Sequence, residues 1–444
     1  MAERTEPRLP VLVVVGTRPE AIKLVPLILA LRRSTVFKPV VLSTGQHQAM
    51  VAEVFALAEI TPDVELWLGA AHGRLNGRVA SQLRRFEDYV CGMFGDLEGE
   101  PATREQVLAG SYPVAALVHG DTTSAFAAAL GAFHLRIPVA HVEAGLRTGG
   151  LNLTPFPEEL NRQLITCIAS LHFAPTPRNE ENLVRENVAG DQVFVTGNTG
   201  IDALQWAAGL NVPFRDTRVA ELVESKERIV VVTAHRRENW GGGLAAIGEG
   251  VARVARAHPD VRFVVPVHPN PRVRSELVPP LEPLGNVLLT EPLKYTSMAR
   301  LLGRCEVVIT DSGGLQEEAP SLGKPVLVTR DSTERTEGVE AGTLRLVGTN
   351  RDRIAAAARR LLEDRTAYEA MAAVPNPYGD GSAAERIVVA LEHVRTGTAA
   401  PAPFGSGFTR SAVLAAAGYD AWQQPLPDET VDDDWSDHLP TDGA

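Results

Sequence analysis

The amino-acid sequence predicts an α/β fold with two doubly wound, Rossmann-like domains that face a cleft. The first observation is that uninterrupted apolar runs of four to six residues recur along the chain. Such runs are typical of strands buried on both faces. The second observation is that Ala/Leu-rich helical segments separate the runs, which favours parallel sheets with helical crossovers. The third is that the runs form two successive series, so we expect two domains.

Each series supplies the strands of one predicted sheet. The first comprises VLVVV (11–15), PVVLS (39–43), VAALV (114–118), PVAHV (138–142), LHFA (171–174) and VFVT (193–196). The second comprises IVVVTA (229–234), RFVVPV (262–267), NVLLT (286–290), EVVIT (306–310) and PVLVT (325–329). We expect an N-terminal domain over residues 1–200 and a C-terminal domain over 201–375, with a helix at 353–373. We expect the segment 376–398, with a helix at 382–395, to cross back to the first domain. Residues 399–444 are predicted to be an acidic, disordered tail.

Composition limits the possible functions of the chain. The 444 residues are 44% hydrophobic and 22% charged, which excludes a disordered protein. The net charge of −12 argues against a basic footprint for nucleic acid over the whole surface. Eight of the acids lie within 411–444, and the rest of the chain carries only −4. Three scattered cysteines predict neither disulfides nor a zinc site, and the run at 11–15 is too short for a signal peptide or a membrane span. We therefore expect a cytoplasmic protein without membrane insertion.

The segment GTRPEAIK (16–23) follows the first expected strand. Gly16 permits a tight turn, and Thr17 with Glu20 forms a candidate capping box that opens a helix. Arg18 and Lys23 then lie near a positive helix end, which suits a phosphate or sugar oxygen. The alternative is a capped helix with two solvated cations. The Gly-x-Gly-x-x-Gly fingerprint of dinucleotide binding is missing.

Three carboxylates of the first domain are candidates for proton transfer, and two of them stand at the ends of expected strands. Asp121 comes after strand 114–118, Glu143 after 138–142, and Glu158 lies in FPEELNRQ (156–163). Carboxylates that converge in one cleft raise one another's pKa, which yields a general acid and a general base near neutral pH. Capping of the next helix by Asp121 and a first-turn position for Glu158 are the structural alternatives. The three together favour chemistry.

Basic side chains follow strands of the second domain. TAHRREN places His235 and Arg236 after strand 229–234, VHPNPR places His268 after the next, and RDSTERTEG supplies Arg335 after the last. A single His at such a position is more often structural than catalytic. No His-Glu-x-x-His motif is present, so we predict no metal ligands. Arg335 is either a ligand-binding cation or a surface charge.

The segment TDSGGLQEEAPSLGKP (310–325) predicts a strand, a glycine turn and a helix. Ser312 is expected to cap this helix, and Gly313 and Gly314 allow backbone N–H groups to approach an anion. A diphosphate fits such a site. Of Glu317 and Glu318, one is expected to accept hydrogen bonds from ribose hydroxyls while the other stays solvated.

Taken together, the motifs resemble the non-hydrolysing UDP-N-acetylglucosamine 2-epimerase family. The matching strings are GTRPEAIKLVP, HGDTTSAFAAAL, HVEAGLRTG, FPEELNR, TAHRREN, HPNPRV and TDSGGLQEEAPSLGKPVLVTRDSTERTEG, in family order over roughly residues 11–395. The resemblance implies a glycosyltransferase B type fold, an active site in the interdomain cleft, a homodimer, and no required metal or cofactor. It implies interconversion of UDP-N-acetylglucosamine and UDP-N-acetylmannosamine, which would supply N-acetylmannosamine-type sugars for cell-surface polysaccharide.

The resemblance also implies roles for residues at matching positions. The catalytic set is Asp121, Glu143, Glu158 and His235. The substrate-binding set is Arg18, Lys23, His235, Leu293, Met298, Ser312, Gly313, Gly314, Glu318 and Arg335. Uracil is expected near Leu293, and Met298 stands where an aromatic residue is common in the family. Some relatives bind a second, activating UDP-sugar, for which the candidates here are Gln46, Arg74, Arg236 and His268.

Four alternatives stay open at the level of sequence. A hydrolysing 2-epimerase uses the same elimination and then releases free UDP and sugar. An epimerase of a UDP-diacetamido sugar would act on a modified substrate. A glycosyltransferase of the same fold would need an acceptor and would leave three carboxylates without a role. A non-catalytic nucleotide-sugar sensor would be expected to lack one of the key carboxylates, and all are present.

Overall fold

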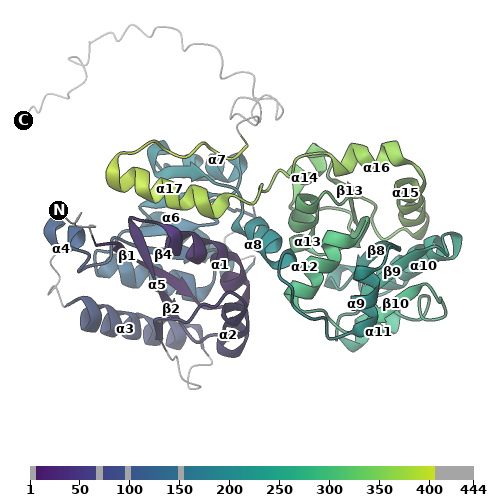
Figure 1. Cartoon of the computed structure of the whole chain (residues 1–444), viewed down its shortest axis with the longest axis horizontal. Helices are drawn as coiled ribbons and strands as arrows, with labels where there is room; N and C mark the ends of the chain where they lie inside the picture. Colours follow the sequence, from purple (N-terminus) through teal and green to yellow (C-terminus); the bar gives the residue numbers. More distant parts are fainter. Residues whose placement is uncertain (1–6, 67–73, 96–101, 149–154, 406–444) are drawn as a thin grey trace, which may run out of the picture. The chain divides into compact units, whose positions relative to one another are not determined.

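The computed structural model describes residues 7–66, 74–95, 102–148 and 155–405, which lie within the unit Met1–Ser406. The predicted α/β class is confirmed, because two parallel sheets with helical crossovers make up this unit (Figure 1). The tail expected at 399–444 lies outside the described residues from residue 406 onward.

The described chain forms a seven-stranded sheet in the order β3-β2-β1-β4-β5-β6-β7 and a six-stranded sheet in the order β10-β9-β8-β11-β12-β13. All neighbouring strands run parallel. The strands are β1 (Leu9–Val15), β2 (Phe37–Ser43), β3 (Val64–Glu65), β4 (Ala115–His119), β5 (Val139–Val142), β6 (Leu171–Ala174), β7 (Val193–Val195), β8 (Arg228–Thr233), β9 (Val261–Pro266), β10 (Val287–Thr290), β11 (Val307–Thr310), β12 (Val326–Val328) and β13 (Leu344–Leu346).

Helices connect the strands and cover the sheets. In the first half they are α1 (Arg18–Arg33), α2 (Gln48–Leu57), α3 (Leu75–Phe94), α4 (Arg104–Leu108), α5 (Thr123–His134), α6 (Glu158–Ile168), α7 (Pro177–Arg185) and α8 (Thr199–Ala208). In the second half they are α9 (Thr217–Glu224), α10 (Gly243–Ala257), α11 (Pro271–Leu277), α12 (Tyr295–Arg304), α13 (Gly313–Glu318), α14 (Thr336–Ala341), α15 (Arg351–Glu363), α16 (Arg365–Ala372) and α17 (Ala383–Thr396).

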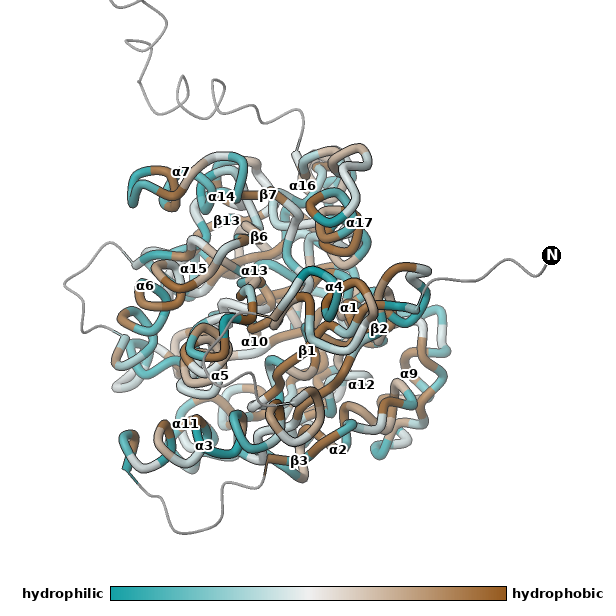
Figure 2. The backbone as a smooth tube through the Cα atoms, turned by 90° about the vertical axis from the view of Figure 1, so that its left-hand side faces the viewer, coloured by the Kyte–Doolittle hydropathy of each residue, from teal (hydrophilic) through white to brown (hydrophobic). Residues whose placement is uncertain are grey.

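The apolar runs form strands because helices bury both of their faces. All seven residues of β1 are buried, and Figure 2 shows the hydrophobic colour along this strand. Alternate residues of β1 belong to different cores: Val13 packs with α1, whereas Leu12 packs with α3 and α5. A continuous apolar sequence is therefore required.

Two features of the secondary structure differ from the expectations. The segment expected as one helix at 353–373 is divided at Asp364, which has an extended backbone and whose carboxylate accepts the N–H of Ala367 at 3.1 Å. Asp364 thus ends α15 and caps α16. The short strands β3 and β13 were not expected, because each contains residues that are not buried and neither forms an apolar run.

The last helix, α17, packs against α1 and α8, as Figure 1 shows. Its Ile387 and Leu391 belong to the apolar core of the first sheet. The N-cap residue Ser382 makes no side-chain capping bond. Instead, the carboxylate of Asp202 on α8 accepts the N–H groups of Ala383 and Ala384 at 3.3 and 2.8 Å. Both apolar and polar contacts therefore fix α17 to the core of the first sheet and to α8.

Helix α8 links the two halves of the described chain. It packs against α1 of the first sheet and against α12 of the second. Its N-cap Asn198 also donates a hydrogen bond of 3.0 Å to Glu317 on α13. None of the described helices is both long and apolar enough to cross a membrane.

Candidate active site

The start of α1 is built as the GTRPEAIK motif predicts. The capping box is confirmed, because Thr17 accepts the N–H of Glu20, whose carboxylate accepts the N–H groups of Gly16 and Thr17 at 2.9 and 2.5 Å. Gly16 is needed for a close approach: an added Cβ would lie 2.5 Å from Ser124. The helix thereby presents Arg18 at its first turn and Lys23 one turn further on.

Glu143 lies at the end of β5 and is the first carboxylate of the site. Its backbone is left-handed, with φ of 65°, and its carboxylate contacts the ammonium of Lys23. His119 Nε2, at the end of β4, lies 3.8 Å from the same carboxylate oxygen. Burial alone would raise the pKa of Glu143, but the Lys23 ammonium holds this pKa below its usual value. Glu143 is therefore ionised at neutral pH.

Asp121 is the second carboxylate, and it does not cap α5. Thr122 performs that function by accepting the N–H of Ala125 at 3.0 Å. The carboxylate of Asp121 instead accepts two hydrogen bonds from Arg162 of α6, at 2.9 and 2.6 Å. Burial raises the pKa of Asp121, and the Arg162 guanidinium opposes this shift. Glu143 and Lys23 also act electrostatically on Asp121, so these groups share one site.

Glu158 lies in the first turn of α6, as the structural alternative to a catalytic role predicted. It is half-buried, and no hydrogen bond or ion pair of the described residues joins it to Asp121 or Glu143. The next residue, Glu159, is only 2% exposed and accepts a 2.6 Å bond from Arg162. The structure thus brings together two of the three expected carboxylates, Asp121 and Glu143. Arg162, which the sequence did not single out, holds the first of them.

On the second sheet, Asp311 organises the loop that carries His235. This fully buried carboxylate accepts the N–H groups of His235 and Arg236 at 2.9 and 2.8 Å and the amide of Asn239 at 3.0 Å. The ring Nδ1 of His235 lies 3.4 Å from Asp311, and the ring stacks on His268 with centroids 5.5 Å apart. Burial lowers the pKa of His235, which the Asp311 carboxylate partly offsets. The expectation from sequence did not include Asp311.

The glycine turn after β11 lies beneath two arginines. A Cβ on Gly313 would approach Arg335 to 3.0 Å and Arg236 to 3.2 Å, so a larger residue here would press on both guanidinium groups. The prediction that the Ser312 side chain caps α13 is wrong. Ser312 occupies the N-cap position, but its side chain accepts no capping hydrogen bond. Its own N–H donates to Thr310 at 2.9 Å. The turn therefore concentrates positive charge at the start of α13.

The two glutamates of α13 differ from the expectation that one of them stays solvated. Glu317 accepts hydrogen bonds from Arg335 at 2.9 Å and from Asn198 at 3.0 Å. Burial raises the pKa of Glu318 to about 8, Glu317 adds to this shift and Lys23 opposes it. Glu317 is thus a structural partner of Arg335, whereas Glu318 remains open toward the cavities described next.

A cavity of about 590 Å³ joins these groups. The expected site residues that line it are Arg18, Lys23, His235, His268, Leu293, Met298, Ser312, Gly314 and Glu318. A smaller cavity of about 150 Å³ shares Lys23, Gly314 and Glu318 with it and is also lined by Glu143 and Arg335. The structure therefore places nearly all expected substrate-binding residues around two adjoining hollows, with Lys23 at their junction.

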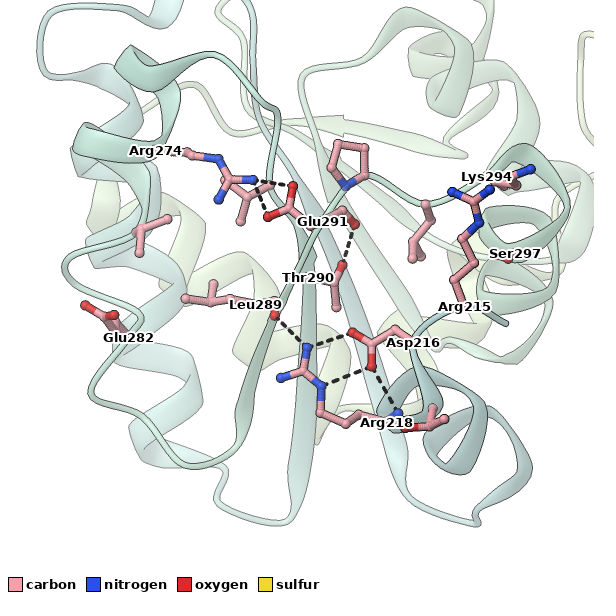
Figure 3. Close-up of a pocket in the computed structure, with 15 residues that line it drawn as sticks. Arg215, Asp216, Arg218, Arg274, Glu282, Leu289, Thr290, Glu291, Lys294 and Ser297 are labelled. Atoms are coloured by element: carbon pink, nitrogen blue, oxygen red, sulfur yellow. Dashed lines mark hydrogen bonds and ion pairs between the residues drawn. The ribbon is translucent and has the colours of Figure 1, made fainter. Parts of the chain in front are cut away.

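A third cavity, of about 670 Å³, shares Pro292 and Leu293 with the first. Figure 3 shows Arg274 paired with Glu291 and Arg218 paired with Asp216 along its walls. The sequence motifs did not indicate this cavity, and its charged groups are largely paired with one another. We therefore centre the candidate site on the two hollows that meet at Lys23.

The four residues of the suggested activating site do not form one group. Gln46 accepts a 2.7 Å bond from Ser124, and Arg236 and His268 lie by Gly313 and His235. Arg74 is exposed at the N-cap of α3, and no contact in the described part of the chain joins it to the other three. Within the described ranges, no group of three or more His, Cys, Asp or Glu side chains is arranged to hold a metal ion.

The raised pKa of Glu318 leads to a stability prediction. A carboxyl whose folded pKa lies above its unfolded value stabilises the fold at low pH, and this contribution is lost as pH rises from about 4.5 through about 8. Replacing Glu318 by Gln removes this loss. We expect the E318Q protein to have a higher thermal midpoint than the parent at pH 9, by a few degrees, and a similar midpoint at pH 5. Calorimetry at both pH values measures this, and equal shifts at pH 5 and 9 would contradict it.

Two Rossmann-like sheets, with cations, a glycine turn and paired carboxylates at their strand ends, define a protein of the glycosyltransferase B fold class. The sequence profile of the UDP-N-acetylglucosamine 2-epimerase family matches residues 102–392. The chain belongs to the UDP-N-acetylglucosamine 2-epimerase family.

Relatives from three bacteria support this assignment. The chain is 45% identical to the Yersinia pestis UDP-N-acetylglucosamine 2-epimerase over 86% of this chain and 98% of that protein. It is 44% identical to the UDP-N-acetylglucosamine 2-epimerase of Escherichia coli K12, over 87% of this chain and 99% of that protein. The crystal structure of the Neisseria meningitidis UDP-GlcNAc 2-epimerase bound to UDP-GlcNAc matches with a TM-score of 0.75 and 39% identity, over 86% of this chain and 98% of that one.

Proposed function

We propose that the protein is a non-hydrolysing epimerase that interconverts UDP-N-acetylglucosamine and UDP-N-acetylmannosamine at C2 of the sugar. The observation that carries this proposal is the arrangement around Lys23. Glu143, whose pKa Lys23 holds low, and Asp121, whose pKa burial raises, interact electrostatically beside hollows lined by cations. Such a pair supplies a base and an acid in one site.

The proposed reaction avoids a free carbanion, because the hydrogen at C2 is not activated by an adjacent carbonyl. As a carboxylate removes the C2 proton, the C2–H electron pair forms the C1=C2 bond and the C1–O bond breaks, which releases UDP within the site. UDP then adds back to C1 of the 2-acetamidoglucal while an acid protonates C2 from the opposite face. We assign Glu143 and Asp121 to the two faces of C2, and their roles exchange in the reverse direction.

Negative charge develops on the β-phosphate as the C1–O bond breaks. Arg18, Lys23 and Arg335, together with the N–H groups of the turn at Ser312–Gly314, would stabilise this charge more strongly in the transition state than in the ground state. We place the uracil against Leu293 and Met298 and a ribose hydroxyl on Glu318, all of which line the larger hollow. His235 lines the same hollow and is assigned to the diphosphate–sugar region.

A homodimer and a cytoplasmic location also belong to this proposal. Exposed apolar side chains lie on three neighbouring helices, at Met93 of α3, Phe133 of α5, and Leu160 and Leu164 of α6. Such a patch is typical of a subunit interface. Analytical ultracentrifugation at micromolar concentration tests it, and a purely monomeric protein would contradict it. All three cysteines are free thiols, in keeping with a reducing compartment.

The deciding experiment uses UDP-N-acetylglucosamine in deuterium oxide, followed by proton NMR. We expect formation of the C2 epimer with deuterium at C2, because the proton removed from one face is replaced from the other by an exchangeable group. Free UDP that accumulates in equal amount with free sugar would indicate the hydrolysing reaction instead. Neither exchange nor a new UDP-sugar would reject the proposal.

A further inference from the structure

His119 is a buried imidazole for which the proposed reaction as described so far has no role. It is the last residue of β4, only 3% exposed, and its Nε2 makes no hydrogen bond in the described structure. Buried polar atoms without a partner are rare in folded proteins because each one is costly. An unpaired nitrogen beside a functional site therefore indicates that its partner arrives in another state of the protein.

The geometry identifies that partner as Glu143. His119 Nε2 lies 3.8 Å from Glu143 Oε2, which is less than about 1 Å beyond hydrogen-bonding distance. The same oxygen is now held by the Lys23 ammonium. Because Lys23 also lines the larger hollow, where we place the diphosphate, a bound diphosphate competes with Glu143 for this cation.

We propose that His119 is a positioning residue for epimerisation: when the diphosphate engages Lys23, the Glu143 carboxylate moves onto the N–H of His119. The inference rests on the proposed function, since it concerns how Glu143 is held for proton transfer at C2. No covalent bond of His119 changes in this step. The imidazole donates one hydrogen bond, and Glu143 exchanges a cation for a neutral donor.

The electrostatics of the site favour this exchange. Burial lowers the pKa of His119 to about 4, so the imidazole is neutral at pH 7 and brings no charge to Glu143. The charged or titratable groups that act on His119 and Glu143 are Lys23 of α1, Asp121 after β4, His141 of β5 and Arg335 at the start of α14. When Lys23 turns to the ligand, the pKa of Glu143 rises and the carboxylate becomes a stronger base. Substrate binding would thereby switch on the proton acceptor.

Two substitutions at His119 test the donor. His119→Gln places an amide N–H near the position of Nε2, whereas His119→Leu is apolar and of similar size. For H119L we expect kcat to fall about 10- to 100-fold, as for loss of a hydrogen bond to a charged group, with the UDP dissociation constant within about twofold of the parent. H119Q should recover most of this loss. The acidic limb of the kcat–pH profile should move to higher pH in H119L, because an ionised Glu143 without its donor has a higher pKa.

Three outcomes would overturn the inference. The first is an H119L protein with kcat within about twofold of the parent. The second is an equal loss of kcat in H119L and H119Q, which would indicate an effect of side-chain volume rather than of hydrogen-bond donation. The third is a loss confined to UDP affinity. If H119L does not fold, the parent protein still decides the matter. In histidine-¹⁵N-labelled parent, UDP should shift the Nε2 resonance of His119, assigned by its absence from the H119Q spectrum, and an unchanged resonance contradicts the inference. A parent that shows this shift but no epimerisation would reject the proposed function separately.

Discussion

Replacing Asp121 by Asn is expected to lower kcat by about 10²- to 10⁴-fold while UDP binds almost as tightly as before. Asparagine keeps the shape of the side chain and an oxygen that accepts from Arg162, so the contact at 2.6 Å has a replacement. It cannot gain or release a proton at neutral pH. Turnover measured by NMR and UDP affinity measured by calorimetry therefore separate the proton-transfer role of Asp121 from any role in binding.

A matched control is Asp216→Asn. Asp216 is also paired with an arginine, Arg218, at 2.7 Å, as Figure 3 shows. It caps α9 and lines the third cavity, whose lining does not include Lys23. We expect this variant to retain parental turnover. An Asp121→Asn protein with kcat within about tenfold of the parent would remove Asp121 from the acid/base pair. A parallel loss of UDP affinity would assign Asp121 to binding instead.

The fold was largely predictable because the apolar runs that form its strands are recognisable in the local sequence. A parallel sheet covered on both faces requires continuous apolar strands, and such runs are visible in the sequence without knowledge of their neighbours. The strands β3 and β13 contain only two and three residues at the sheet edges, so they leave no such signal. The division between α15 and α16 depends on one capping side chain, Asp364, within a helical pattern.

The site was predictable only in part. Residues that follow a strand can be recognised from the local sequence, but their hydrogen-bond partners come from distant parts of the chain. Asp121, Glu143 and His235 follow strands and were singled out for that reason. Arg162 bonds Asp121 across 41 positions of sequence. The only local signal for this arginine is its spacing of three from Glu159, which places both side chains on one helix face. Glu158 was expected in the catalytic set on the same local grounds, whereas its neighbour Glu159 is the residue that points into the protein.

Replacing Arg162 by Met is expected to destabilise the protein by about 3–5 kcal/mol, since it leaves two carboxylates without their shared cation. Glu159, at 2% exposed, cannot recover hydration, and Asp121 also loses the group that opposes the burial shift of its pKa. A carboxyl whose folded pKa is raised further above its unfolded value stabilises the fold at low pH. This contribution to stability is lost as pH rises through the folded pKa. Urea unfolding should therefore show a smaller deficit at pH 5 than at pH 8.

The same substitution at Arg185 is the control. Arg185 is 60% exposed and pairs with Glu181 one turn earlier on α7, so both groups of this pair regain water when it is broken. We expect Arg185→Met to cost no more than about 1 kcal/mol, without pH dependence. An Arg162→Met deficit no larger than that of Arg185→Met would mean that water replaces the guanidinium at Asp121. A deficit equal at pH 5 and pH 8 would mean that the lost contribution is apolar packing of the arginine stem, which does not depend on the ionisation of the carboxyls.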